Sequence, residues 1–157
     1  MVRMSHHLAQ VNIGRMLHPI DDPRMSAFVA HLDPINALAD SAPGFVWRLQ
    51  SGSGNATDVP YSDDPFVIVN MSVWESLEAL RDYTYNSHHI GVFRDRSRWF
   101  EKMERPQYCL WWIPAGHIPT VAEARERLEH YQVHGPTPYS FWFSQPFPAA
   151  ATPLAVR

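Results

Sequence analysis

The alternation of apolar and polar positions along the chain predicts a small set of strands. Successive side chains of a strand point to opposite faces, so a half-buried strand alternates, whereas a strand buried on both faces is a short apolar run. Residues 67–69 (VIV) form such a run and are rich in β-branched side chains. Strands are expected over residues 7–17, 45–50, 67–69 and 107–113, with an edge strand over 139–143.

Apolar residues that recur every three or four positions predict helices between these strands. Asp22 followed by Pro23 marks the start of a first helix, which Pro34 is expected to kink or split. Capping boxes at Ser72–Glu75 and Thr120–Glu123 mark two later starts, so the strand over 67–69 should end at the first box.

A break near Asn86 separates the helix after the first capping box from another helix, which is expected to reach Phe100. The resulting order, βαββαβ followed by a helix, predicts a ferredoxin-like α+β domain with an antiparallel sheet and two helices on one side. The later strands are apolar on both faces, so the sheet needs a second layer, and a second copy of the chain is its simplest source.

We expect one domain over residues 6–143 and a proline-rich, disordered tail over 144–157. The polar stretch over 51–65 is too long for a tight turn and is a candidate lid. Residues 144–157 and 51–65 are thus the two parts expected to lie outside the packed core.

Composition narrows the classes of function. The 157 residues carry a net charge of −3, which provides no basic field for nucleic acid. Aromatic residues make up 13% of the chain, which indicates a pocket for an apolar ligand, an oligomer interface, or both. No apolar run approaches a membrane span or a signal peptide, so we expect a cytoplasmic protein without membrane contact. Cys109 is the only cysteine and is expected to be an inert core thiol.

His89 is the first candidate for chemistry, because histidine can accept or donate a proton near neutral pH. It lies four residues before Phe93 and seven before Arg96, so on a helix all three project to roughly the same side. We expect His89 and Arg96 to be catalytic and Phe93 to contact substrate. The alternatives are a capping or core role for the histidine and a solvated helix face for the arginine.

Three polar residues stand among apolar neighbours on the expected strands, namely Asn12, Arg48 and Asn70. Buried polar groups need hydrogen-bond partners, so each either braces a loop or orients a ligand carbonyl in a cavity. We expect Asn70 and Arg48 to be catalytic groups and Asn12 to bind substrate. Asn70 is the best placed, because it lies just before the expected cap at Ser72.

Aromatic side chains could form the wall of a pocket for a flat substrate. The candidates are Trp47, Trp74, Tyr83, Phe93, Trp99 and Trp112. The alternative is ordinary core or dimer contact.

The sequence contains no HExxH motif and no closely spaced set of metal ligands. The segment SGSG lacks both the phosphate-loop lysine and the dinucleotide-binding spacing. We therefore predict no metal and no organic cofactor.

Several segments together resemble a bacterial family of domains of unknown function. They are HLAQVNIGR, PGFVWRLQ, VNMSVWESLEAL, RSRWF, LWWIPAGHIPTVAEARERL and HGPTPYSFWF. That family is placed with the dimeric α/β-barrel proteins, which include antibiotic-biosynthesis monooxygenases, small cyclases, muconolactone-type isomerases and haem-degrading enzymes. The resemblance implies the ferredoxin-like fold, a homodimer and a cavity between each sheet and its helices.

The resemblance suggests an enzyme of secondary metabolism, of the monooxygenase, cyclase or isomerase type, acting on an aromatic or polyketide-like molecule. His89 would then move the proton, and Asn70 or Arg48 would stabilise enolate or phenolate charge. Haem-degrading relatives carry an Asn, an aromatic residue and a His in the order of Asn12, Tyr83 and His89. A haem protein with His89 as the axial ligand is therefore one alternative, and a non-catalytic ligand-binding module is another.

Overall fold

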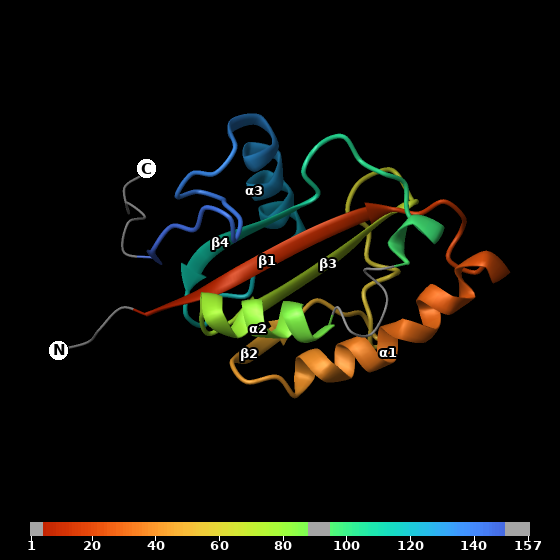
Figure 1. Ribbon diagram of the computed structural model, residues 1–157, viewed down its shortest axis with the longest axis horizontal. Coiled ribbons are helices and arrows are strands. Elements are labelled where there is room, and N and C mark those ends of the chain that lie inside the picture. The colour runs from red at the N-terminus through yellow and green to blue at the C-terminus, as the bar shows by residue number, and fades with distance from the viewer. Residues whose placement is uncertain (1–4, 88–94, 150–157) are drawn as a thin grey trace.

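The computed structural model describes residues 5–87 and 95–149 (Figure 1). The sheet has four strands in the order β2-β3-β1-β4, and all neighbouring strands are antiparallel. This is the ferredoxin-like arrangement, so the predicted α+β fold is confirmed. The elements are β1 (His6–Arg15), α1 (Ser26–Asp40), β2 (Phe45–Arg48), β3 (Val67–Trp74), α2 (Leu77–Ser87), β4 (Tyr108–Pro114) and α3 (Val121–His134), with 3-10 turns at Pro23–Met25 and Arg96–Arg98.

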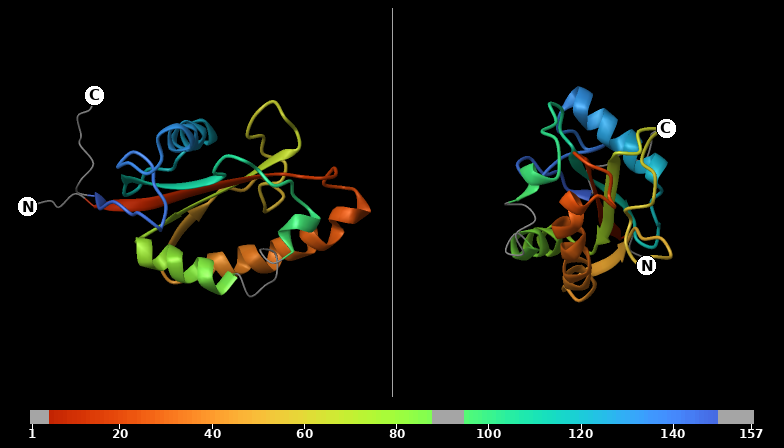
Figure 2. Two further views of the ribbon diagram at one scale, coloured as in Figure 1. Left: turned by 45° about the horizontal axis from the view of Figure 1, so that its top comes forward. Right: turned by 90° about the vertical axis from the view of Figure 1, so that its right-hand side faces the viewer.

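The two faces of the sheet are covered by different helices. Helices α1 and α2 lie on one face and α3 on the other, which we call the α1/α2 face and the α3 face (Figure 2). On the α3 face, Ala124 and Leu128 are fully buried against the odd-numbered residues of β1, β3 and β4. The chain therefore supplies its own second layer. The expectation that a second copy must cover this face is not needed to explain its apolar side chains.

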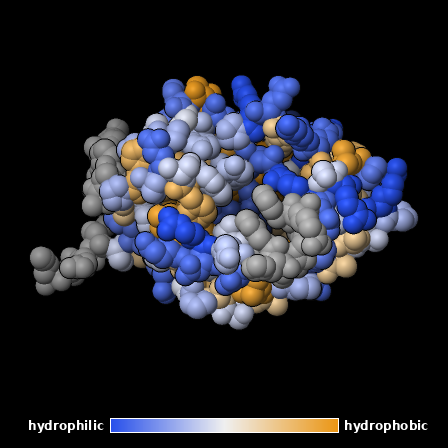
Figure 3. All heavy atoms as spheres, in the orientation of Figure 1, coloured by the Kyte–Doolittle hydropathy of each residue, from blue (hydrophilic) through white to orange (hydrophobic). Residues whose placement is uncertain are grey.

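The exposed apolar surface is scattered. Large hydrophobic side chains with substantial exposure come from separate segments, namely Leu17, Val29, Val46, Tyr85, Ile118 and Val133. Figure 3 shows hydrophobic spots set apart among hydrophilic atoms on one side of the molecule. Within residues 5–87 and 95–149, no helix combines the length and apolar character needed to cross a membrane.

The first helix begins as predicted but is not split. The Asp22 side chain accepts a hydrogen bond from the Arg24 N–H at 2.8 Å and caps the turn that leads into α1. Pro34 lies inside a continuous helix. Proline removes the hydrogen bond to the carbonyl four residues earlier, but Ala30 and Pro34 are both exposed, so water can satisfy that carbonyl.

The capping box predicted at Ser72–Glu75 is wrong. Strand β3 continues through Ser72 to Trp74, because both residues are buried in register with β1. Helix α2 begins only at Leu77, where the Ser76 hydroxyl accepts a hydrogen bond from the Ala79 N–H at 3.0 Å. Burial of the last three strand residues, Ser72 to Trp74, thus overrides a local helix-start signal.

The helix start predicted at Thr120 is confirmed, because the Thr120 side chain accepts the Glu123 N–H at 3.1 Å, and Gly135 follows the last residue of α3 as its C-cap. The second half of the predicted capping box is replaced, because the Glu123 carboxylate accepts from the Trp111 indole at 3.0 Å. The edge strand expected over 139–143 is only an isolated bridge. In this bridge, Phe141 and Leu110 exchange backbone hydrogen bonds of 2.7 and 2.9 Å.

The helix expected to reach Phe100 is also absent from residues 95–100, where Arg96–Arg98 forms a short 3-10 turn.

Two segments expected outside the core make contacts with it. In the loop over 51–65, Tyr61 is buried in the cluster on the α3 face, and its carbonyl accepts a hydrogen bond from Arg125 at 2.6 Å. In the tail, the Phe147 carbonyl accepts a hydrogen bond from the Trp112 indole at 2.7 Å. Residues 144–149 therefore differ from the disordered tail expected over 144–157.

Gly44 provides a test of the connection between α1 and β2. Its φ of 82° favours glycine, and a Cβ there would lie 2.5 Å from the Cβ of Ala79. We expect Gly44→Ala to lower the free energy of unfolding by about 2 kcal/mol or more in urea denaturation. Gly52→Ala is the matched control, because nothing lies within 4 Å of its added Cβ, and equal effects of the two substitutions would contradict the prediction.

Candidate functional site

Four polar side chains meet in the middle of the α1/α2 face, and we call them the polar floor. They are Gln10 and Asn12 of β1 and Asn70 and Ser72 of β3. The antiparallel register places Gln10 opposite Ser72 and Asn12 opposite Asn70. Because β1 and β3 are the two central strands, the polar floor occupies the centre of the sheet.

The polar floor is one connected hydrogen-bond network. Gln10 Nε2 donates to Asn70 Oδ1 at 2.7 Å and to Ser72 Oγ at 2.8 Å. Asn12 Nδ2 donates to Asn70 Oδ1 at 3.2 Å and to Gln10 Oε1 at 3.4 Å. Trp74 Nε1 donates to Ser72 Oγ at 2.8 Å. Both N–H groups of the Gln10 amide are therefore used inside the protein.

Exposure divides the polar floor into two halves. Gln10 and Ser72 are only 6% and 5% exposed, whereas Asn12 and Asn70 are exposed even though they lie on central strands. Buried polar groups must be paired, and the buried half meets this requirement through its own network. Solvent reaches the other half, so a ligand can reach it as well.

Apolar clusters flank the polar floor on the same face. One lies toward the start of β1 and contains Leu8, Ala39, Trp74, Leu80, Leu110 and Phe141. The other lies toward the end of β1 and contains Met16, Met25, Phe28 and Trp99. Two exposed amides thus separate two apolar regions, which suits a molecule that combines ring surface with a polar group.

The predicted aromatic wall residues of these clusters are core side chains. Trp74 and Trp99 are 0% and 1% exposed. Tyr83 stacks on Trp74 with ring centroids 4.8 Å apart, and its hydroxyl donates to the Ile35 carbonyl at 3.5 Å. Their contacts fit the alternative of core packing, with Trp74 also holding Ser72 in place.

Arg48 forms hydrogen bonds that connect three segments of the chain. Its Nε donates to the Asp40 carboxylate at 2.8 Å, and its Nη1 donates to the Gly54 carbonyl at 2.8 Å. The guanidinium therefore ties β2 to the last residue of α1 and to the loop over 51–65. These contacts fit the loop-bracing alternative better than the catalytic role predicted for Arg48.

Trp47 lies on the wrong face for the predicted pocket. It pairs with Val73 and packs into the cluster on the α3 face. A residue on that face cannot contact the same ligand as Asn70 on the α1/α2 face, because the sheet lies between them. The single pocket wall expected from the sequence is therefore divided between the two faces.

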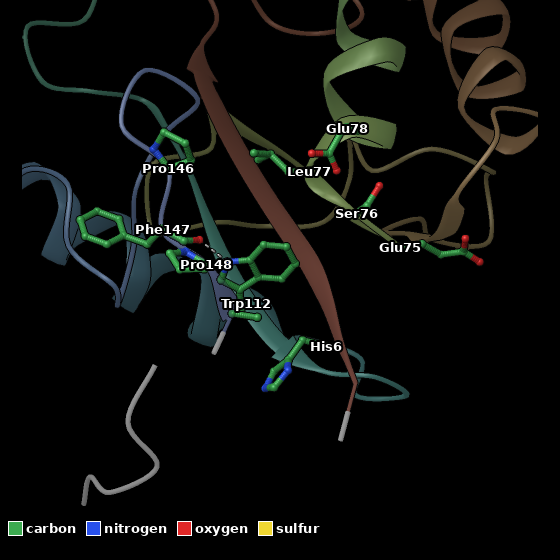
Figure 4. Close-up of a pocket in the computed structure, with 10 residues that line it drawn as sticks. His6, Glu75, Ser76, Leu77, Glu78, Trp112, Pro146, Phe147 and Pro148 are labelled. Atoms are coloured by element: carbon green, nitrogen blue, oxygen red, sulfur yellow. Dashed lines mark hydrogen bonds between the residues drawn. The ribbon is translucent and has the colours of Figure 1, made fainter. Parts of the chain in front are cut away.

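Trp112 lines an open hollow of about 550 Å³ at one end of the α1/α2 face (Figure 4). The hollow lies between the start of α2, at Leu77, and the tail segment that contains Phe147. His6 of β1 is at its rim. Trp112, one of the aromatic residues predicted to contact substrate, thus lines a surface cavity. Its indole N–H already donates to the Phe147 carbonyl.

Two of the residues on which the sequence prediction relied, His89 and Phe93, lie outside the described residues. Arg96 begins a 3-10 turn, and its carbonyl accepts hydrogen bonds from the Trp99 and Phe100 N–H groups. A continuous helical face joining His89 to Arg96 is therefore not part of the described structure. Their shared site stays a prediction.

No group of three or more His, Cys, Asp or Glu side chains suited to a metal occurs in the described part of the chain. Cys109 is buried, and burial raises the pKa of its thiol above the usual range. Such a thiol is a poor nucleophile, in line with the predicted core role.

Sequence reasoning missed Gln10 and Ser72 as parts of the site. The alternation of β1 puts Gln10 on the same face as Asn12, and this signal was available in the sequence. Ser72 was hidden by its resemblance to a helix cap. Its partner Gln10 lies 62 residues earlier in the chain, and only the strand pairing brings the two together.

A family model described as a domain of unknown function, DUF3291, matches residues 7–155. Among solved structures, a protein of unknown function from Nitrosomonas europaea has a TM-score of 0.44 and 12% identity, covering 73% of this chain and 96% of its own. A candidate antibiotic biosynthesis monooxygenase from Chloroflexus aurantiacus has a TM-score of 0.42 and 15% identity, covering 73% and 98%. No curated protein matches the chain.

Tyr83 gives a prediction of pH dependence. Burial raises the pKa of Tyr83 to about 12, above the ordinary value of 10.0, so the folded state holds this proton more tightly than the unfolded state. Its stabilising contribution is complete below about pH 10 and is lost as the pH rises through about 12. Tyr83→Phe should therefore flatten the fall in unfolding free energy across this range. Parallel curves for the two proteins in urea titrations would contradict this.

Proposed function

We propose that this chain, which belongs to the DUF3291 family, binds a small, partly aromatic molecule on the α1/α2 face and acts on it without an organic cofactor. One observation carries the proposal: Asn12 and Asn70 are exposed at the centre of the sheet between two apolar clusters. Apolar residues are the ones most often buried, and these positions lie on a sheet face that α1 and α2 cover, so exposed amides there support a role in binding.

The polar floor suits molecules with a carbonyl group. Amide N–H groups can donate to a carbonyl oxygen, and they stabilise it more strongly as negative charge develops. Oxygenation, cyclisation and isomerisation next to a carbonyl can all begin with loss of a proton from carbon. An electron-rich enolate or phenolate can then react with dioxygen directly, which is why no flavin or metal is required.

The proton acceptor in this proposal is His89, with Arg96 as a second catalytic group. Both roles come from the sequence pattern. The polar floor itself consists of amides and a hydroxyl, which do not accept protons at neutral pH. A base from elsewhere in the chain is therefore required for chemistry, and a histidine has the appropriate pKa range.

A non-catalytic ligand-binding module is the second candidate. The same observation favours it, since the described network of Gln10, Asn12, Asn70 and Ser72 contains no titratable side chain. Such a floor can orient a ligand without changing it. Turnover, rather than binding, is the property that separates the two candidates.

The homodimer and the cytoplasmic location also remain proposals. Since α3 already covers one face of the sheet, a dimer would use another surface, such as the edge at β2 or the hollow beside Phe147. Haem with His89 as its axial ligand remains the alternative cofactor. Asn12, which the haem hypothesis also uses, is already tied to Gln10 and Asn70.

Anthrone tests the proposed enzyme, because its central methylene enolises readily and one anthrone with one dioxygen gives anthraquinone and water. We expect the protein to accelerate quinone formation in air-saturated buffer. His89→Ala should lower kcat/KM by about 10² or more if His89 is the base. His88→Ala is the matched control, because it removes the neighbouring imidazole in the sequence and leaves His89 in place.

Equal rates for His89→Ala and the wild type would remove His89 from the mechanism. Anthrone that binds without turnover would favour the non-catalytic module. If anthrone and related aromatic ketones neither bind nor react, the proposed pocket on the α1/α2 face is contradicted.

The haem alternative is tested by an ultraviolet-visible spectrum with native mass spectrometry, before and after hemin is added. We expect a colourless protein with no Soret band and a mass that reports the dimer. A Soret band that disappears in His89→Ala would instead make this a haem protein and move the chemistry to iron.

A further inference from the structure

We infer that the polar floor selects a neutral carboxamide-type edge, in which a carbonyl acceptor lies beside an N–H or O–H donor, over a carboxylate. Primary amides, lactams and the enol forms of β-dicarbonyl compounds have such an edge. The inference rests on the proposed function, because it assigns the chemical class of the ligand at the same site.

The hydrogen-bond positions of the two exposed amides support this choice. An asparagine side chain has an oxygen with two acceptor positions and a nitrogen with two donors. Asn70 Oδ1 accepts from both Gln10 and Asn12, so its acceptor positions are filled. Its Nδ2 donates to none of the residues that the structure describes. Asn12 shows the opposite pattern. Its Nδ2 donates to Gln10 and Asn70, and its Oδ1 accepts from none of the residues that the structure describes.

The hydrogen-bonding groups left unused are therefore a donor, Asn70 Nδ2, and an acceptor, Asn12 Oδ1, on neighbouring strands. Asn12 and Asn70 are direct partners in the register, and side chains opposite each other in an antiparallel pair are about 5 Å apart at Cβ. A single planar group can span that distance. An amide edge would accept from Asn70 Nδ2 through its carbonyl and donate to Asn12 Oδ1 through its N–H.

A carboxylate does not fit this pair. It has acceptors only, so Asn12 Oδ1 would face a lone pair and remain without a donor. No cationic side chain in the described part of the chain hydrogen-bonds to the polar floor. Arg48, on the neighbouring strand and opposite Ser72, is already paired with Asp40 and Gly54. The desolvation cost of the carboxylate charge would therefore not be compensated.

Gln10 is a positioning residue for this edge. It is buried, and its amide links Asn70 to Ser72, which in turn accepts from the indole of Trp74. By occupying Asn70 Oδ1, Gln10 leaves the N–H groups of Asn70 as its exposed part. Loss of Gln10 should thus weaken the preference for amides without removing the ring-binding surface.

The test uses one ring with three end groups: naphthalene-2-carboxamide, naphthalene-2-carboxylate and methyl naphthalene-2-carboxylate. Binding is measured by titration of ¹⁵N-labelled protein, with the side-chain amide signals of Asn12 and Asn70 as local reporters. We expect the carboxamide to bind about tenfold more tightly than either of the others, which corresponds to one net hydrogen bond. This comparison needs no variant.

Variants then assign the preference to residues. Asn70→Asp should weaken carboxamide binding about tenfold, because it replaces the exposed donors with an acceptor. Gln145→Glu makes the same amide-to-carboxylate change at an exposed position outside the polar floor, and should leave binding unchanged. Gln10→Leu should reduce the carboxamide preference to about threefold or less, while thermal unfolding reports a folded protein and the ester still binds.

The outcomes separate this inference from the proposed function. If all three molecules bind equally and Asn70→Asp has no effect, a ligand pocket exists but the inference is wrong. Tighter binding of the carboxylate would overturn it as well. If none of the three binds, the proposed ligand site on the α1/α2 face fails together with the inference.

Discussion

The antiparallel register between β1 and β3 is the constraint on which the rest of the structure depends. It pairs Gln10 with Ser72 and Asn12 with Asn70, and it places the neighbouring odd-numbered residues on the α3 face. A slip of one residue would turn every side chain of a strand to the opposite face. The two polar groups of that strand would then enter the apolar core under α3, which is why burial specifies this register strongly.

The polar floor resolves two conflicting demands. Buried polar groups are costly unless paired, and exposed polar groups at the centre of a sheet give up core packing. Gln10 donates to Ser72 and Asn70, and Ser72 also accepts from Trp74, so the buried half is satisfied. The exposed half, Asn12 and Asn70, then gains rigidity from that buried half. A rigid set of neutral donors and acceptors is suited to recognition, because little conformational entropy is lost when a ligand binds.

Two of the predicted site residues, Arg48 and Trp47, make structural contacts for the same physical reason. Arg48 stands on a strand where its charge needs compensation, and Asp40 at the end of α1 provides it. Trp47 follows the alternation of β2 onto the α3 face, where its ring adds to the core. The proposed site therefore relies less on charge and aromatic rings than the composition predicted, and more on side-chain amides whose hydrogen bonds are only partly used.

The sequence by itself determined the order of elements, the ferredoxin-like class and the caps at Asp22 and Thr120, because these depend on local periodicity and nearby backbone groups. It also identified Asn12 and Asn70 as polar residues out of place on strands. Only the tertiary structure decided that Ser72 is a strand residue, that Gln10 joins it, and that α3 rather than a second copy covers the far face. The reason is that pairing and burial between distant segments outweigh local signals worth about 1 kcal/mol.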